Sequence, residues 1–150
     1  MDVQFRTATK KDKEILERFQ AKLVQFERAI VPTIPKDTVY YDIDELLTHK
    51  ETLVLIITAD GKDIGCGFAQ VRVKEECASE RSGYIGMMYL EEEFRKRGIG
   101  TTLVKKFLEW LHEKKVQDIR LRVYDKNLDA VHAYRNCGFE SFMVEMIYKK

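Results

Sequence analysis

Three β-patterned segments follow one another in the middle of the chain, and an amphipathic helical pattern flanks them on each side. Residues 53–58 form an apolar, β-branched run, and the Asp60-Gly61 pair after it favours a two-residue hairpin turn. Partner strands are expected at about residues 63–74 and 84–90. Strands joined by hairpins pair antiparallel, so the chain predicts a meander whose apolar faces need helices to cover them.

The flanking helices are predicted from apolar residues that recur every three or four positions. The first spans residues 10–28, where Thr9 and Asp12 form a capping box at its start and two prolines follow its end. The second spans residues 101–115 and carries lysines and glutamates on its outer face. A short additional helix is expected over residues 42–49.

The remaining segments complete an α/β order. They are a first strand at residues 3–8, a polar loop or wide hairpin at 75–81, an alternating strand at 119–124, a helix at 128–137 closed by Gly138, and a last strand or strand pair at 139–148. The predicted fold is a single α/β domain over residues 1–150. Its mixed central sheet has the order β-α-α-β-β-β-α-β-α-β and is flanked by helices.

Composition narrows the classes of function. Lysine and arginine total 26 against 25 aspartate and glutamate, so nothing in the net charge of +1 attracts nucleic acid or a membrane surface. No apolar run approaches the ~18 residues of a membrane span, and the N-terminus lacks a signal-peptide pattern. Three widely spaced cysteines favour reduced thiols in a cytoplasmic protein, and no Cys/His cluster has the spacing of a metal site.

Residues 91–101 carry the chemistry that can be predicted from the sequence. Gly98 and Gly100 let the backbone approach a ligand closely, and the loop runs into a helix N-terminus with unpaired N–H groups. Three cations precede the glycines: Arg95, Lys96 and Arg97. Thr101 and Leu103 exclude a Walker loop and a dinucleotide fingerprint respectively. The segment therefore predicts an anion site, most simply for a pyrophosphate, against the alternative of a tight turn with a solvated basic run.

Two linked motifs identify a family. Arg95-x-x-Gly98-x-Gly100 resembles the Gln/Arg-x-x-Gly-x-Gly/Ala acetyl-CoA signature of the GNAT superfamily of N-acetyltransferases. Residues 127–139 resemble the family's Asn-x-x-Ala-x-x-x-Tyr-x-x-x-Gly-Phe pattern. The resemblance covers the whole chain in element order and is specific from about Tyr84 to Phe139. It implies the GNAT fold and an N-acetyltransferase that uses acetyl-CoA as co-substrate without a metal.

The resemblance also assigns roles to individual residues. Acetyl-CoA is expected to bind Met88, Leu90, Arg95, Lys96, Arg97, Gly98, Ile99, Gly100, Thr101 and Asn127. Tyr134 is expected to be the general acid that protonates the departing thiolate. Each role has a plain alternative: Met88 and Leu90 as core residues, Asn127 as a helix N-cap, and Tyr134 as a core aromatic.

The general base and the acceptor are less defined. Tyr84 and Arg122 occupy positions where some family members carry a glutamate, so the proton is expected to leave through water or the amine to arrive neutral. Glu27 either faces the acceptor or is a solvated or ion-paired residue. A rim of Asp37, Tyr40, Tyr41, Asp42 and Glu27 suits a small cationic amine. A protein N-terminus or lysine, and a non-catalytic acetyl-CoA sensor, are the alternatives.

The segment after Gly138 bears on the oligomeric state. Its 12 residues are too few for the long terminal hairpin that some family members fold over the acceptor. The cleft is then either open or completed by a second subunit, so a homodimer is one expectation.

Overall fold

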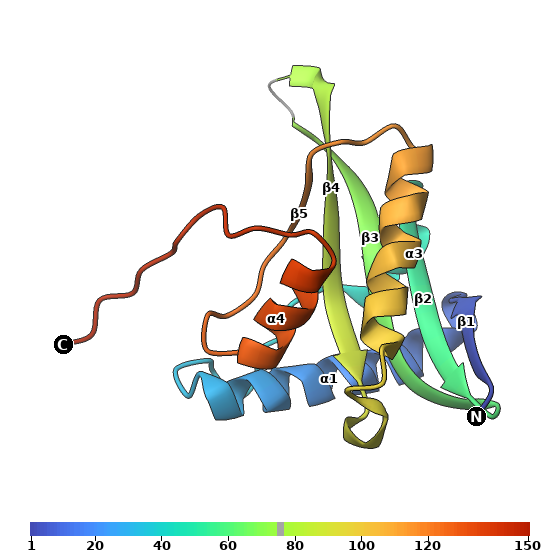
Figure 1. The fold of residues 1–150 in the computed structure, drawn as a ribbon, viewed down its shortest axis with the longest axis horizontal. Helices are drawn as coiled ribbons and strands as arrows, with labels where there is room; N and C mark the ends of the chain where they lie inside the picture. The colour runs from blue at the N-terminus through green and yellow to red at the C-terminus, as the bar shows by residue number, and fades with distance from the viewer. Residues whose placement is uncertain (75–76) are drawn as a thin grey trace.

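The computed structural model describes residues 1–74 and 77–150, which form a five-stranded sheet with helices on both faces (Figure 1). The elements in order are β1 (Val3–Thr7), the short 3₁₀ turn η1 (Lys10–Asp12), α1 (Lys13–Ile30), α2 (Ile43–Thr48), β2 (Thr52–Ala59), β3 (Lys62–Lys74), β4 (Cys77–Leu90), the 3₁₀ turn η2 (Glu92–Phe94), α3 (Ile99–Glu113), β5 (Ile119–Leu121) and α4 (Leu128–Asn136). None of the helices in the described part of the chain is long and apolar enough to cross a membrane.

The sheet is mixed, as its sequence predicts. Strands β1 to β4 pair antiparallel with their neighbours, and β5 joins the outer edge of β4 in parallel. The turn between β2 and β3 places Asp60 at φ 49° and Gly61 at φ 83°, the two positive values of the hairpin turn that the Asp-Gly pair favours. The predicted meander is confirmed.

Local capping explains where the helices begin. The Thr9 N–H donates to the Asp12 carboxylate at 2.8 Å, so the predicted capping box is present. At α2, the Asp42 carboxylate accepts from the Glu45 N–H at 3.2 Å. Asp42 is therefore a helix cap.

Two apolar clusters hold the sheet between its helices. Alternation along β2 sends Val54 and Ile56 toward α1 and α2, and Leu55 and Ile57 toward α3. On the first side Phe19 and Phe68 are fully buried, and on the second side Phe107 is. The two helical layers thus lie on opposite faces of one sheet (Figure 1).

Three expectations about strand length are wrong. The strand expected from residue 84 begins at Cys77, because antiparallel pairing with β3 continues as far as Lys74 and Cys77, as in the wide-hairpin alternative; residues 75–76 lie outside the described part of the chain. The strand expected at 119–124 stops at Leu121, where its pairing with Ile85 of β4 ends. Residues 139–148 form no strand. Phe142, Met146 and Tyr148 within them are 76%, 89% and 88% exposed.

Candidate functional site

A bulge interrupts β4 four residues before its end. Cys66 pairs with Tyr89 and Phe68 pairs with Gly86, so β4 carries one residue more than β3 between the two pairs. Met87 absorbs the extra residue at φ 50°. A Cβ on the facing Gly67 would lie 2.7 Å from the Met88 sulfur and 3.0 Å from the Phe107 ring, so a larger residue there would require these side chains to shift. The sequence pattern predicted a bulge near Gly86 but did not indicate that Gly67 packs against it.

The outer edge of β4 loses its neighbour at the same point. Pairing with β5 covers Gly83 to Ile85 and then stops. Within the described residues, no strand pairs with the outer edge of β4 over residues 86–90. Met88 and Leu90 direct their side chains into the cluster under α3, which confirms their core role. Their backbone leaves room for an extended ligand at the split between β4 and β5.

The loop after β4 ends on a helix N-terminus. Gly98 is the N-cap of α3 with φ 81°, a left-handed backbone that favours glycine, and Ile99 is buried below it. Gly100 has no positive φ, and a Cβ there would meet nothing within 4 Å. Half-exposed Thr101 completes the first turn. The backbone conformation therefore favours glycine at position 98 but does not require it at position 100. The space beside Gly100 is open, and a ligand could occupy it.

The three predicted cations differ in their surroundings. Lys96 and Arg97 are exposed beside the helix N-terminus. The Arg95 guanidinium instead donates from Nε to the Leu90 carbonyl at 2.7 Å and lies 4.6 Å from the Phe26 ring. Arg95 thus ties the loop to the end of β4, and its contact with a ligand stays a prediction.

Helix α4 brings the second motif to the split. Asn127 Oδ1 accepts from the Ala130 N–H at 3.4 Å, which confirms its role as N-cap. Tyr134 is half-buried, and its ring meets Phe139 edge-on with centroids 6.2 Å apart. Burial, and then the negative charge of Glu27, raises the pKa of Tyr134 to about 12. The phenol therefore keeps its proton at neutral pH.

Comparison with known proteins agrees with this arrangement. The sequence profile of the acetyltransferase (GNAT) family matches residues 16–139, which is most of the chain. The chain belongs to the GNAT acetyltransferase family. The bulged strand, the glycine loop and the Asn-Tyr helix described above all lie inside the matched range.

Individual relatives cover different parts of this GNAT chain. An N-alpha-acetyltransferase 30 from Dictyostelium discoideum is 39% identical over 57 residues, which are 38% of this chain and 31% of that protein. The matched stretch is thus less than a third of that relative's length. A protein from Bacillus halodurans has a similar structure with a TM-score of 0.84 and 17% identity, covering 98% and 99% of the two chains. A protein from Clostridium acetobutylicum, named a predicted acetyltransferase and solved with acetyl-CoA, has a TM-score of 0.72 and 19% identity, covering 99% and 96% of the two chains.

The two positions where some GNAT members carry a glutamate lack a carboxylate here. Tyr84 lies under the Arg72 guanidinium, 3.9 Å from the ring centroid, and its hydroxyl is 3.4 Å from that of Tyr41. Arg122 is exposed. Glu27 is half-buried, which differs from the solvated alternative, because the linker between α1 and α2 folds over the end of α1.

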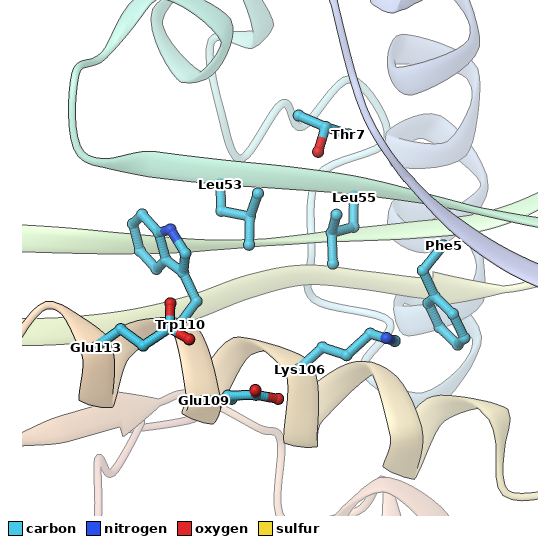
Figure 2. Close-up of a pocket in the computed structure, with 8 residues that line it drawn as sticks. All are labelled: Phe5, Thr7, Leu53, Leu55, Lys106, Glu109, Trp110 and Glu113. Carbon is cyan, nitrogen blue, oxygen red and sulfur yellow. The ribbon is translucent and has the colours of Figure 1, made fainter.

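A separate groove of about 240 Å³ lies between α3 and the β1–β2 side of the sheet (Figure 2). It exists because α3 packs on β3 and β4 and leaves this part of the same sheet face uncovered. Its floor is Leu53 and Leu55, and Trp110 and Lys106 of α3 form one wall. The groove is remote from the split between β4 and β5, so it is not part of the candidate GNAT site.

Proposed function

We propose that this protein transfers the acetyl group of acetyl-CoA to a primary amine. The observation that carries the proposal is the open space at Gly100, on a helix N-terminus that follows directly on an unpaired strand edge. Unpaired N–H groups and two exposed cations there suit a pyrophosphate. The unpaired edge of β4 suits the amide-bearing arm of the cofactor, which would bond to it as a missing strand does.

The chemistry assigned to the chain follows from this placement. A backbone N–H near Met88 at the bulge polarises the thioester carbonyl, and one donor of this kind typically contributes ~2.7–4 kcal/mol to the transition state. The amine attacks directly while both substrates are bound, so positioning supplies a large part of the rate. The Tyr134 phenol returns a proton to the departing sulfur.

The acceptor in this proposal is a small cationic amine. Support comes from Glu27, a half-buried carboxylate on the acceptor side of the split. The two aspartates of the predicted acidic rim give weaker support for a cationic acceptor, because Asp42 is engaged as a helix cap and Asp37 is exposed. A peptide with a free N-terminus is the second candidate acceptor, since the Dictyostelium relative is named an N-alpha-acetyltransferase.

Two measurements test the proposal. Calorimetry is expected to show that acetyl-CoA binds more tightly than pantetheine, which lacks the pyrophosphate. Release of free thiol is then measured across a panel of an aliphatic diamine, an aminoglycoside and a short peptide with a free N-terminus. Tight acetyl-CoA binding without turnover on any amine would favour the non-catalytic sensor instead, and absence of binding would reject both.

We further propose that the chain forms a homodimer through its last residues. Phe142, Val144 and Met146 are between 76% and 89% exposed, an apolar surface unusual for an isolated chain. The outer edge of β5 carries no strand among the described residues. Pairing residues 140–148 of one copy with the β5 edge of another would cover both features.

A further inference from the structure

Glu27, near the end of α1, lies among tyrosines that come from four other parts of the chain. Tyr40 and Tyr41 belong to the linker before α2, Tyr84 to β4, Tyr124 to the segment after β5, and Tyr134 to α4. Three of these tyrosines, Tyr40, Tyr41 and Tyr134, interact with the Glu27 carboxylate. The other two lie behind them, Tyr124 beside Tyr40 and Tyr84 beside Tyr41. This gathering depends on tertiary structure, because the residues are spread over more than 100 positions of sequence.

The linker is held in place independently of any ligand. Gln20 of α1 accepts from the Tyr41 N–H at 2.8 Å and donates to the Tyr41 carbonyl at 3.0 Å. The Tyr41 ring packs edge-on against Phe68 with centroids 4.9 Å apart. A Cβ on Gly86 would lie 2.8 Å from the Tyr41 hydroxyl, so that hydroxyl rests directly on β4 beside the bulge. The acceptor side is thus a preformed wall.

Within that wall, the buried Tyr40 hydroxyl lies close to the side-chain oxygens of Glu27 and Tyr124 but forms no hydrogen bond of good geometry with any described residue. Burial, then the nearby oxygens of Glu27 and Tyr124, raise the pKa of Tyr40 well above its ordinary value. Buried polar atoms normally form well-aligned hydrogen bonds, so a hydroxyl that only approaches a carboxylate leaves room for a ligand group that contacts both.

The carboxylate itself lacks a cation. In residues 1–74 and 77–150, no lysine or arginine forms an ion pair with Glu27, whereas Asp12, Asp44, Glu51 and Glu91 all have one. A half-buried carboxylate without a counter-charge is costly in a folded protein. A substrate ammonium would supply the missing charge.

We propose that Glu27, with the Tyr40 hydroxyl, binds the ammonium group of the acceptor and removes the proton that blocks its attack on the thioester. The inference rests on the proposed acetyl transfer and adds the base that the sequence did not reveal. It places that base on α1, across the split from Tyr134, and not on β4 or β5.

The proton and electron balance is complete with the groups named. One ammonium proton moves to a Glu27 carboxylate oxygen, and the freed nitrogen lone pair forms the bond to the carbonyl carbon. The carbon–sulfur bond breaks with its electron pair on sulfur, which takes the Tyr134 proton. The surplus proton on the new amide nitrogen restores the phenol through solvent, and Glu27 releases its proton to solvent.

Burial supports the assignment, because it raises the pKa of Glu27 above its ordinary value, while the Tyr40 hydroxyl acts in the opposite direction. A raised pKa makes the carboxylate a better proton acceptor. The titratable groups that interact with it are Tyr40, Tyr41 and Tyr134, and Arg72 of β3 stacks on Tyr84 beside Tyr41.

The test compares Glu27→Gln with Glu14→Gln, the same chemical change at an exposed position of α1. With an aliphatic amine acceptor, Glu27→Gln is expected to lower kcat/KM by about 10²–10⁴-fold and to leave acetyl-CoA affinity unchanged by calorimetry. With the β,β,β-trifluorinated analogue of that amine, whose three fluorines leave it uncharged at neutral assay pH, the loss is expected to be far smaller. Glu14→Gln is expected to behave as wild type with both.

Tyr40→Phe gives a second readout, the pH dependence of kcat. Loss of the hydroxyl that lowers the pKa of Glu27 should move the acidic limb of kcat to higher pH, which a purely structural role would not do. Wild-type kinetics in Glu27→Gln, or an equal loss with charged and uncharged amines, would overturn this inference alone. A wild-type protein that binds acetyl-CoA and acetylates no amine would overturn the proposed function as well.

Discussion

Tyr134 shows how burial changes the meaning of a single side chain. An isolated phenol has a pKa near 10, so the sequence predicts a loss of turnover at high pH as the acid ionises. Burial and the charge of Glu27 raise this pKa to about 12, so the limb moves beyond the usual assay range. The role of Tyr134 as general acid is therefore tested by measuring kcat in a variant that lacks the hydroxyl.

Replacement of Tyr134 by phenylalanine is expected to lower kcat by about 10²–10⁴-fold, because only the proton donor is lost. The ring contact with Phe139 is kept, so the melting temperature should change little. Stopped assays of thiol release and calorimetry with acetyl-CoA are the measurements, with Tyr148→Phe at an exposed position as the control. Full turnover in the mutant would reduce Tyr134 to a packing residue.

Glu27 also predicts a pH dependence of stability. Its folded-state pKa is raised, so from about its ordinary value of 4.5 upward the folded chain holds a proton that the unfolded chain has released. Stability therefore falls as the pH rises through this window. Glu27→Gln removes that fall, so its melting temperature relative to wild type should increase from acidic to neutral pH. Thermal unfolding across pH measures this, and a difference that shrinks toward neutral pH would contradict it.

At the scale of elements, the first turn of α3 separates the needs of folding from those of binding. Gly100 has helical backbone and open space around it, so alanine there should gain up to ~1 kcal/mol of helix propensity. The same methyl group occupies the space proposed for the pyrophosphate. Gly100→Ala is therefore expected to raise the melting temperature by a few degrees while it weakens acetyl-CoA binding.

Thermal unfolding and calorimetry on the same preparation test that prediction. Glu109→Ala, at an exposed position of the same helix, should leave acetyl-CoA affinity unchanged. An unaltered affinity in Gly100→Ala would place the cofactor elsewhere on the chain.

Local patterns predict elements well and their lengths poorly. The capping box at Thr9, the Asp60-Gly61 turn and the N-cap at Asn127 depend on neighbours within a few residues, so the sequence reveals them. The end of β5 at Leu121 depends on how far β4 stays beside it, which no local pattern records. The glycine loop could be predicted from sequence for the first reason. Glu27 could be named only as one of two alternatives, because its neighbours come from the linker before α2 and from α4.

At the scale of the whole molecule, the exposed segment after α4 predicts an association. A chain ending at Glu140 lacks the exposed Phe142 to Tyr148 surface but keeps Phe139 against Tyr134. We expect the intact chain to be a dimer and the shortened chain a monomer with unchanged helix content. Size-exclusion chromatography with light scattering and circular dichroism check this. Equal masses for the two chains would contradict the proposed pairing.

Trp110 is the only tryptophan of the chain, and it stands at the wall of the groove between α3 and the β1–β2 side of the sheet (Figure 2). Its indole is half-exposed, with the Lys114 ammonium 5.4 Å from the ring. The protein therefore carries a built-in fluorophore on the sheet face opposite α1 and Glu27. Its emission will follow the separation of α3 from the sheet and stay insensitive to an amine at Glu27, so denaturation can be followed optically while the acceptor site is saturated.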